Sequence, residues 1–326
     1  MLYHLLYPLS RYSIVFNVMR YITFRSLGAF VTALLFTLLA GPSFIRLLKR
    51  KAAVETIDAD VPEKHRAKAG TPTMGGLLII FGLLIASLLW NDLTNRSIIM
   101  MFLTTLWLGV FGFLDDYLKN FLKLKKGLVP KYKLWGQVSV GLLLTLAIYY
   151  GGTGSEVTNL QIPFFKNLII PLGWTFIPLM VFYITGISNA VNLTDGLDGL
   201  SAGVMIFSAV GLGIMSYLKG NFNSAAYLHL EFIPTAGELT VFIAGLIGTL
   251  IGFLWFNSHP AEVFMGDTGS LTLGGILAVI SILLKEQIYF VIIGFLFISE
   301  TLSVIIQRTW FKHTKRRYGE GRRVFL

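Results

Sequence analysis

The sequence predicts an all-α, multi-pass membrane protein that forms a single domain over residues 1–326. Two observations predict this class. Hydrophobic residues make up 55% of the 326 residues and charged residues only 13%, with a mean hydropathy of +0.71, which is far too apolar for a soluble domain. The apolar residues also gather into runs of about 20, the length that an α-helix needs to cross a bilayer. We therefore expect a bundle of membrane-spanning helices.

Nine such runs follow an amphipathic N-terminal segment. Residues 1–25 mix apolar and aromatic side chains with Arg11, Arg20 and Arg25, which is typical of a helix that lies in the membrane interface. Farther along, residues 152–171 carry glycines and a proline, and we expect a short hairpin there without a chemical role. The predicted spans are residues 26–46, 74–91, 97–114, 134–151, 172–189, 200–218, 239–256, 270–285 and 287–306.

The basic residues predict the orientation of these spans. Most of the 27 Lys and Arg residues fall within three segments, 46–68, 119–133 and 308–323. Cytoplasmic loops of membrane proteins are enriched in Lys and Arg, so these segments and the C-terminus are expected in the cytoplasm and the N-terminus outside. The same rule accounts for the net charge of +10, and we expect no nucleic acid as a partner.

Several kinds of chemistry are excluded by missing residues or motifs. The chain has no cysteine, which excludes disulfides and thiol chemistry. It has no P-loop, no Gly-x-Ser-x-Gly elbow and no His-Glu-x-x-His helix. The N-terminus lacks the short apolar core and small-residue cleavage site of a removable signal peptide. The candidate chemistry therefore lies in carboxylates, lysines and glycine-rich turns.

A basic, glycine-rich motif precedes the second predicted span. It reads His65-Arg-Ala-Lys-Ala-Gly-Thr-Pro-Thr-Met-Gly-Gly76, in which the glycines and the proline predict a rigid turn. Lys68 has two interpretations: a ligand for a phosphate or nucleobase, or an ordinary cation of a cytoplasmic loop. His65 alone in a loop is expected to be solvated.

A pair of acids ends the third predicted span, in Phe113-Leu-Asp-Asp-Tyr-Leu-Lys119. Adjacent Asp115 and Asp116 project on different sides of a helix, so one can bind a cation while the other faces a substrate. Lys119 has the spacing of an ordinary helix ion pair with them. The alternative is a solvated acidic helix end.

The most polar stretch between two apolar runs is Asn189-Ala-Val-Asn-Leu-Thr-Asp-Gly-Leu-Asp-Gly-Leu200. Charges at the edge of a membrane cost several kcal/mol unless water, a cation or a ligand meets them. The spacing of Asn192, Asp195 and Asp198 predicts that all three lie on one side of a helical turn. We interpret this set as a site for a hard cation or a polar ligand; the alternative is that one Asp caps the helix beginning near Leu200.

A fourth motif, Phe264-Met-Gly-Asp-Thr-Gly-Ser-Leu271, precedes the eighth predicted span. The backbone N–H groups at the start of that helix favour an anion such as phosphate, and Asp267 would repel a bare phosphate less if Mg²⁺ bridged them. A simple N-cap box is the alternative.

These acids fall at separate helix ends that the predicted orientation brings to one membrane face. Carboxylates, glycine turns and lysines together fit Mg²⁺-assisted chemistry on a diphosphate, because Mg²⁺ keeps few protein ligands and takes the rest from water and phosphate. An ion-coupled transporter is an alternative of another class, but its acids are expected near the middle of the membrane in broken helices or inverted repeats.

The four motifs, in this order, resemble the polyprenyl-phosphate N-acetylhexosamine-1-phosphate transferase superfamily, and within it the phospho-N-acetylmuramoyl-pentapeptide transferase family. The resemblance runs from the first predicted span to the end of the chain. It implies transfer of phospho-N-acetylmuramoyl-pentapeptide from UDP to undecaprenyl phosphate with Mg²⁺, giving lipid I and UMP in peptidoglycan synthesis. It also implies a multi-pass protein of the bacterial inner membrane with its active site at the cytoplasmic face.

The resemblance further implies roles for residues at matching positions. Asp267 is similar to the Mg²⁺ ligand, with Asp115 and Asp116 as further candidates, and Phe264 would stack on uracil. The implied catalytic residues are Asp115, Asp116, Asp267, Lys68, Asn192 and Asp195. The implied substrate-binding residues are Lys68, Thr73, Lys119, Asn192, Asp195, Gly196, Leu197, Asp198, Phe264 and Gly266.

The end of the chain differs from the family pattern. The family continues past a basic loop into a His-rich motif and a tenth helix, whereas this chain ends at Arg322-Arg-Val-Phe-Leu326 and His313 does not match that motif. We therefore expect a chain truncated at its C-terminus relative to the family. A homodimer is left open.

Two mechanisms and one related substrate remain open. In the first mechanism the lipid phosphate attacks the β-phosphorus in line, with Mg²⁺ on Asp267 and with Asp115 orienting or deprotonating the nucleophile. In the second, Asp115 or Asp116 is phosphorylated first. The related alternative is a sister enzyme that uses UDP-N-acetylglucosamine, although the motif Thr71-Pro-Thr-Met-Gly-Gly76 favours the muramoyl-pentapeptide substrate.

Overall fold

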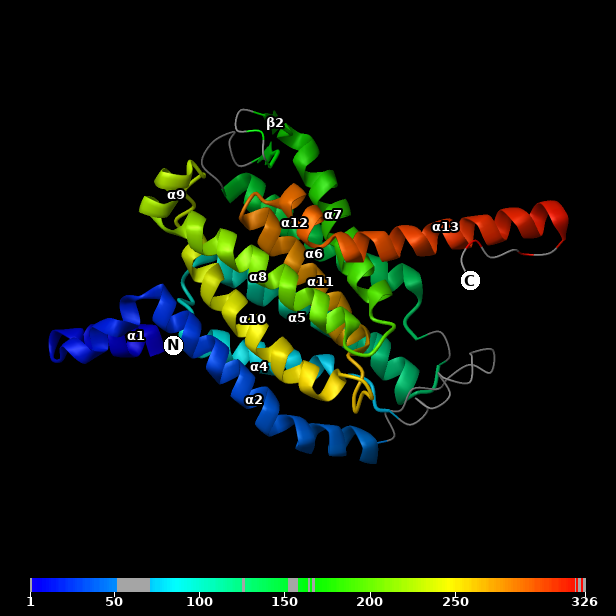
Figure 1. Ribbon diagram of the computed structural model, residues 1–326, viewed down its shortest axis with the longest axis horizontal. Coiled ribbons are helices and arrows are strands. Elements are labelled where there is room, and N and C mark those ends of the chain that lie inside the picture. The colour runs from blue at the N-terminus through cyan, green and yellow to red at the C-terminus, as the bar shows by residue number, and fades with distance from the viewer. Residues whose placement is uncertain are drawn as a thin grey trace.

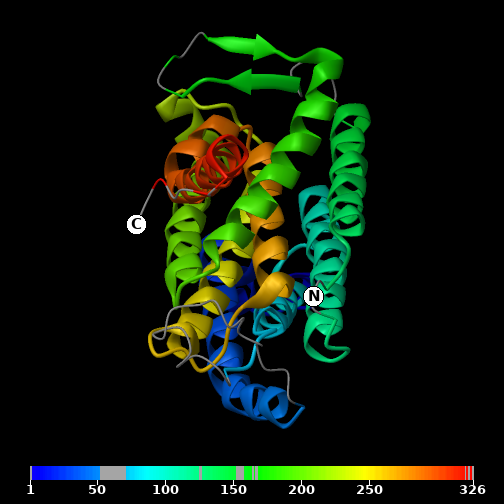
Figure 2. The same ribbon diagram turned by 90° about the vertical axis from the view of Figure 1, so that its right-hand side faces the viewer.

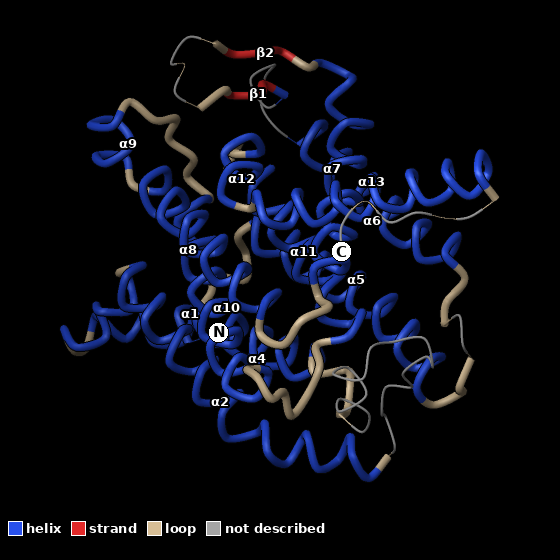
Figure 3. Tube along the Cα trace, turned by 45° about the vertical axis from the view of Figure 1, so that its right-hand side comes forward, coloured by secondary structure: helices blue, strands red, loops and turns tan. Residues whose placement is uncertain are grey.

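A computed structural model describes residues 2–51, 71–124, 127–151, 158–163, 165, 168–319, 321 and 324. These residues are mostly helical, with two short strands (Figure 3). The elements are α1 Leu2–Leu6, η1 Tyr7–Arg11, η2 Ile14–Arg20, α2 Ile22–Arg50, α4 Gly76–Trp90, α5 Arg96–Asn120, α6 Pro130–Gly151, β1 Asn159–Gln161, β2 Ile169–Pro171, η4 Gly173–Thr175, α7 Phe176–Thr194, α8 Leu200–Gly220, α9 Phe222–Leu228, α10 Ala236–Asn257, α11 Gly266–Leu283, α12 Gln287–Ile293 and α13 Phe295–Tyr318.

The helices form a multi-pass bundle, but the predicted count of nine spans is not confirmed. Among the described residues, seven helices are long and apolar enough to cross a membrane, and eight if the bent pair α12 and α13 is one span. Helix α4 is apolar but has only 15 residues. The predicted run 287–306 is not one straight helix, because the chain bends by 77° between α12 and α13, and α13 projects away from the bundle (Figure 1).

Helices α10 and α11 form the centre of the bundle. Helix α10 packs against α2, α4 and α8, and α11 packs against α5 and α7. Both helices are apolar around most of their circumference, with side chains such as Phe242, Phe253 and Ile276 fully buried. A helix that is hydrophobic all round is one that the rest of the protein covers. The outer helices α2, α5 and α6 instead expose one apolar face, as a membrane requires.

The N-terminal segment differs from its prediction at Arg25. Residues 2–20 form three short helical pieces, and Arg25 belongs to α2. This residue is 3% exposed, and its guanidinium pairs with Glu238 in the first turn of α10, with Nη1 donating to Oε2 at 2.8 Å. Arg25 is therefore a buried residue paired with an acid of another helix, and it is not part of the short helical pieces before α2.

A two-stranded hairpin closes one end of the bundle (Figure 2). As predicted, the segment between α6 and α7 contains this hairpin, with β1 antiparallel to β2 and Leu160 opposite Ile170. Because α6 ends at Gly151 and α7 begins at Phe176, the hairpin lies at the end where these helices meet it. The C-terminal end of α5 and the start of α11 lie at the other end.

Candidate active site

Three carboxylates from two helices meet at the end of the bundle away from the hairpin. Asp115 and Asp116 lie in the last turns of α5, and Asp267 lies in the first turn of α11. Each offers one ligand atom, and these atoms lie within 4.8 Å of one another. Asp115 and Asp116 are 2% and 3% exposed. The fold thus joins acids that are about 150 positions apart in the chain into one cluster.

Two lysines lie between these carboxylates. Lys119 Nζ is 2.5 Å from Asp115 Oδ2 and 2.7 Å from Asp267 Oδ2, so the helix ion pair predicted for Lys119 is present and also reaches α11. Lys133, in the first turn of α6, has its Nζ 2.8 Å from Asp267 Oδ2 and 3.8 Å from Asp115 Oδ2. The ammonium groups of Lys119 and Lys133 therefore occupy the space between Asp115 and Asp267, and this space favours positive charge.

Asp116 faces a different way, toward the start of α11. Its Oδ1 accepts a hydrogen bond from the backbone N–H of Asp267 at 3.1 Å. Its Oδ2 accepts from the backbone N–H of Thr268 at 2.8 Å and from Thr268 Oγ1 at 2.6 Å. We predicted that these helix N–H groups would favour a phosphate; in the structure the anion that they meet is Asp116. The alternative N-cap box is not formed by the N-cap residue Met265 either.

Two glycines allow α5 to lie so close to α11. A Cβ atom at Gly112 would lie 2.5 Å from the carbonyl oxygen of Asp267. At Gly266, where φ is +73°, a Cβ would lie 2.6 Å from Asp116 Oδ2 and 2.8 Å from Thr73 Oγ1. A side chain at either position would push the two helix ends apart. The structure thereby places Thr73 and Gly266 beside the acid cluster.

The motif that begins at Thr71 pairs with the segment before α11. The Phe264 N–H donates to the Pro72 carbonyl, and the Gly75 N–H donates to the Phe264 carbonyl, each at 2.8 Å. Gly76 and Met265 are joined in the same way. The side chain of Phe264 is partly exposed. Lys68 lies outside the described residues, so its predicted contact with a substrate stays a prediction.

The stretch 192–198 is built differently from the single helical face that we predicted. Helix α7 continues to Thr194, beyond the predicted end at 189, so Asn192 is helical. Asp195 is the residue after the helix, with φ −78° and ψ 52°, and Asp198 lies in the turn before α8. The three side chains therefore do not share one helix face, because the helix ends between the first and the second of them.

The N-cap residue of α8 is Gly199, with φ +73°, and it has no side chain that could cap the helix. The backbone N–H of Gly199 donates to Asn257 Oδ1 at 3.1 Å. Asp198 instead contacts the loop that leads to α11, with Oδ2 2.9 Å from His259 Nδ1 and 3.4 Å from the Ala261 N–H. Gly196 and Leu197, in the same turn, are exposed.

Two residues with contacts in this region, Lys133 to Asp267 and His259 to Asp198, belong to no motif in the sequence. Lys133 was counted only among the basic residues of a cytoplasmic segment, and its one distinguishing signal is its place directly before an apolar run. His259 is a lone histidine in a loop, and no spacing in the sequence connects it with Asp198, which lies about 60 positions earlier. Only the folded chain brings each to its partner.

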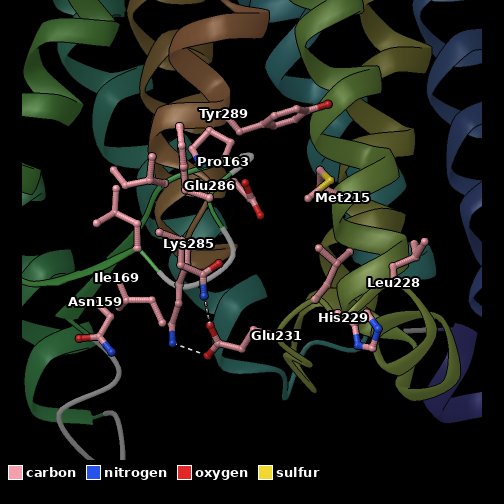
Figure 4. Close-up of a pocket in the computed structure, with 15 residues that line it drawn as sticks. Asn159, Pro163, Ile169, Met215, Leu228, His229, Glu231, Lys285, Glu286 and Tyr289 are labelled. Atoms are coloured by element: carbon pink, nitrogen blue, oxygen red, sulfur yellow. Dashed lines mark hydrogen bonds and ion pairs between the residues drawn. The ribbon is translucent and has the colours of Figure 1, made fainter.

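A cavity of about 750 Å³ lies at the hairpin end of the bundle, and its lining residues are drawn in Figure 4. One of its acids has two partners: Lys285 pairs with Glu231, and Gln161 Nε2 donates to Glu231 Oε2 at 2.6 Å. Beside it the buried Lys219 pairs with Glu286 at 2.6 Å. These pairs tie the hairpin to the bundle, and the described residues that line the cavity include no cluster of unpaired acids. The candidate reaction site is therefore the acid cluster at the other end.

The acid cluster suits a hard divalent cation. Carboxylate oxygens are the protein ligands that Mg²⁺ prefers, and the ligand atoms of Asp115, Asp116 and Asp267 are close enough to share one ion. Two ammonium groups already lie against Asp115 and Asp267, so these carboxylates are directed at a common positive charge. The donor set therefore fits the metal that the resemblance implies.

Comparison with known proteins supports the same family as the four motifs. Residues 98–285 match the profile of glycosyl transferase family 4, and residues 68–80 match the phospho-N-acetylmuramoyl-pentapeptide-transferase signature 1. The first range runs from the start of α5 through α11 and so includes all three acids of the cluster. The second includes Thr73 and the turn that pairs with Phe264.

Several relatives are similar over nearly the whole chain. The phospho-N-acetylmuramoyl-pentapeptide-transferase of Chlorobium phaeobacteroides is 50% identical over 313 residues, which are 95% of this chain and 85% of that protein. Those of Pelodictyon phaeoclathratiforme and Gemmatimonas aurantiaca are each 48% identical, over 95% and 98% of this chain and 84% and 87% of their own lengths. With the two matching profiles and the paired motifs around the acid cluster, this chain belongs to the phospho-N-acetylmuramoyl-pentapeptide-transferase family and is a phosphoglycosyl transferase.

Proposed function

We propose that this enzyme transfers phospho-N-acetylmuramoyl-pentapeptide from UDP to undecaprenyl phosphate with Mg²⁺, giving lipid I and UMP at the cytoplasmic face of a bacterial inner membrane. The observation that carries the proposal is the meeting of Asp115, Asp116 and Asp267 with two lysines at one end of an apolar bundle. A diphosphate and a lipid phosphate together need a site of this composition, placed where a lipid head group can reach it.

Asp267 and Asp115 are the residues that would hold Mg²⁺. When bound, this ion would neutralise charge on the diphosphate and on the departing UMP. Lys119 and Lys133 keep their ammonium groups within 4 Å of both carboxylates and would bind phosphate oxygens that enter between them. Asp115 would orient the lipid phosphate or remove its proton. Lys68 and Asn192 are proposed to complete the phosphate site.

The turn between α7 and α8 is the proposed uridine site. Asp198 is held there by His259 and by the Ala261 N–H, so the loop before α11 and the turn after α7 form one surface. Asp195 and Asp198 would accept hydrogen bonds from the nucleotide, and the exposed Gly196 and Leu197 leave room for it. On the same loop, the partly exposed ring of Phe264 would stack on uracil.

An apolar groove supports a prenyl chain as the second substrate. It has a volume of about 400 Å³ between α6 and α7, and its lining includes Leu134, Val138, Leu142 and Phe182. Leu134 directly follows Lys133, whose ammonium contacts Asp267. A lipid whose phosphate reaches Lys133 would therefore have its hydrocarbon beside this groove. Burial of about 0.8 kcal/mol per CH₂ group would favour a long chain there.

The reaction that we propose is a single in-line displacement. An oxygen of the lipid phosphate forms a bond to the β-phosphorus of the UDP-sugar, the bond from that phosphorus to the bridging oxygen breaks, and UMP leaves with the electron pair. In this proposal Asp115 would take the proton of a protonated acceptor. The two-step alternative, with a phosphorylated aspartate, needs a carboxylate oxygen directed at the β-phosphorus.

UMP release is the measurement that tests this function. The purified protein is incubated with UDP-N-acetylmuramoyl-pentapeptide and undecaprenyl phosphate, with and without Mg²⁺, and compared with Asp267→Ala. Glu262→Ala is the matched control, because Glu262 is an exposed acid in the loop just before Asp267. We expect Mg²⁺-dependent UMP release that Asp267→Ala abolishes and Glu262→Ala retains. Release only with UDP-N-acetylglucosamine would instead identify the sister activity.

A further inference from the structure

Asp116 is adjacent to Asp115 in the chain, yet the two carboxylates have different surroundings. Asp115 faces the ammonium groups of Lys119 and Lys133 and accepts a hydrogen bond from the Leu128 N–H at 2.7 Å. Asp116 is 3% exposed, and both of its oxygens accept hydrogen bonds from the first residues of α11. Successive side chains of a helix point in different directions, so one aspartate faces the charged space and its neighbour faces α11.

The backbone N–H groups at the start of α11 need a hydrogen-bond acceptor from outside the helix. The first N–H groups of a helix have no acceptor within the helix, and the N-cap residue Met265 supplies none from its side chain. An anion at that position is favoured by the helix dipole, and hydrogen bonds to a carboxylate are about twice as strong as those between neutral groups. Asp116 therefore caps α11 from another helix and satisfies the N–H groups of Asp267 and Thr268.

We propose that Asp116 is a positioning residue, which fixes the first turn of α11 so that the Asp267 carboxylate faces Asp115 and the two lysines. Asp267 is the residue whose own N–H donates to Asp116, so the acid that would hold Mg²⁺ is attached to Asp116 through its backbone. This inference rests on the proposed function for its metal, and it gives the two adjacent aspartates separate tasks. It leaves Asp115, whose Oδ2 contacts Lys119 and Lys133, as the member of the pair that faces the proposed metal site.

The geometry around Asp116 supports this assignment over direct metal binding. Gly266 has no side chain and a φ of +73°, and any Cβ there would lie 2.6 Å from Asp116 Oδ2. Gly112 allows the carbonyl of Asp267 to approach α5 from the other side. The first turn of α11 is thus held between α5 and the Thr73 segment, and Asp116 accepts the hydrogen bonds of its backbone. If Asp116 turned toward a metal, both N–H groups and the Thr268 hydroxyl would lose their acceptor, and a buried donor without an acceptor destabilises the fold.

The test removes the hydrogen bond between Thr268 and Asp116 by changing each partner in turn, and it measures metal binding without turnover. Mn²⁺ serves as the probe, and its binding to the purified protein is titrated by electron paramagnetic resonance. The variants are Asp116→Asn, Thr268→Val and the double variant. Thr268→Val changes no charge and removes only the hydroxyl that donates to Asp116. Thr272→Val is the matched control, because the Thr272 hydroxyl donates to the Thr268 carbonyl within α11 and does not contact Asp116.

We expect Thr268→Val to weaken Mn²⁺ binding by about tenfold and Asp116→Asn by about 10- to 100-fold, as for other residues that orient a metal ligand. The double variant should be no weaker than Asp116→Asn alone, because both changes break one contact. Thr272→Val should bind as the wild type does, and Thr268→Ser, which keeps the hydroxyl, should bind more tightly than Thr268→Val. In UMP release, kcat should fall with little change in the KM for the UDP-sugar.

Other results would overturn the assignment. If Thr268→Val binds Mn²⁺ as the wild type does while Asp116→Asn loses binding as fully as Asp267→Asn, then Asp116 is itself a ligand. Additive effects in the double variant, or no saturable Mn²⁺ binding by the wild type, would also contradict it. Because Thr268→Val is nearly isosteric, its result stands even if Asp116→Asn fails to fold. A wild type that binds Mn²⁺ but releases no UMP would contradict the proposed function and leave the positioning role intact.

Discussion

Lys133 Nζ lies 2.8 Å from Asp267 Oδ2, which joins the first turn of α6 to the first turn of α11. The side chain of Lys133 is 20% exposed, half as much as that of Lys119 on the same carboxylate. The two lysines hold Asp267 from two helices, so the acid cluster is a set of five charged groups and not three. This contact makes Lys133 the first residue to test.

Replacing Lys133 by Met is expected to lower kcat for UMP release by on the order of 100-fold, the effect of removing one charge-stabilising donor from an active site. Lys131→Met is the control, because Lys131 is a neighbouring exposed lysine of the same segment. Lys133→Arg should recover part of the activity, since the charge remains while the geometry changes. Equal rates for the two Met variants would remove Lys133 from the site.

The number of chemical steps is tested by isotope exchange. In a single displacement, the β-phosphorus bond to UMP breaks only when the lipid phosphate attacks. Labelled UMP should therefore not enter the UDP-sugar while the lipid acceptor is absent, and should enter once the acceptor is added. Exchange without acceptor at a rate near kcat would show a covalent intermediate in which an aspartate carries the phospho-sugar.

The groove between α6 and α7 is tested by filling it. Val138 lines the groove and is 37% exposed, so Val138→Trp would exclude about two CH₂ groups of a bound chain. At about 0.8 kcal/mol for each, the KM for undecaprenyl phosphate should rise roughly tenfold. Leu106→Trp, on the exposed face of α5, is the control, and an equal rise for both variants would contradict the assignment.

Gly266 is expected to be intolerant of any side chain. Its φ of +73° opposes Gly266→Ala, and so does Asp116 Oδ2, which would lie 2.6 Å from the added Cβ. A shift of the first turn of α11 by about 1 Å can reduce a rate by about 100-fold, and we expect a loss of that size in UMP release. Gly203→Ala, in α8 where a Cβ meets nothing within 4 Å, should retain activity.

The ion pair at the hairpin end is expected to affect stability and not catalysis. Lys219 is fully buried and pairs with Glu286, which is 8% exposed. Lys219→Met would leave a buried carboxylate without its cation, which costs about 3–5 kcal/mol. Thermal unfolding of the purified protein should show a lower Tm. The double variant Lys219→Met with Glu286→Gln should recover part of that loss, and an unchanged Tm in the single variant would contradict the role of this pair.

Most of the helices could be predicted from hydropathy, because a membrane-spanning helix must carry a long apolar run whatever its neighbours are. The run 287–306 shows where this signal fails. It is apolar over most of its length, but the chain bends by 77° between α12 and α13, which Gly294 separates. Likewise α7 extends through Asn192 to Thr194, because a polar residue at the membrane edge does not end a helix by itself. Hydropathy therefore predicts the presence of a helix more reliably than the residue at which the helix ends.

The kind of site could be inferred from the chain before folding: acids, lysines and glycine turns at helix ends, in the order of a known family. Which of these groups face one another depends on the packed bundle. Asp115 and Asp116 are neighbours in the sequence, but one faces Lys119 and the other caps α11. Lys133 had no motif, yet it contacts Asp267. The reason is that composition and spacing fix what each helix end carries, whereas a contact between helices depends on their packing, which long-range burial and close approach at Gly112 and Gly266 determine.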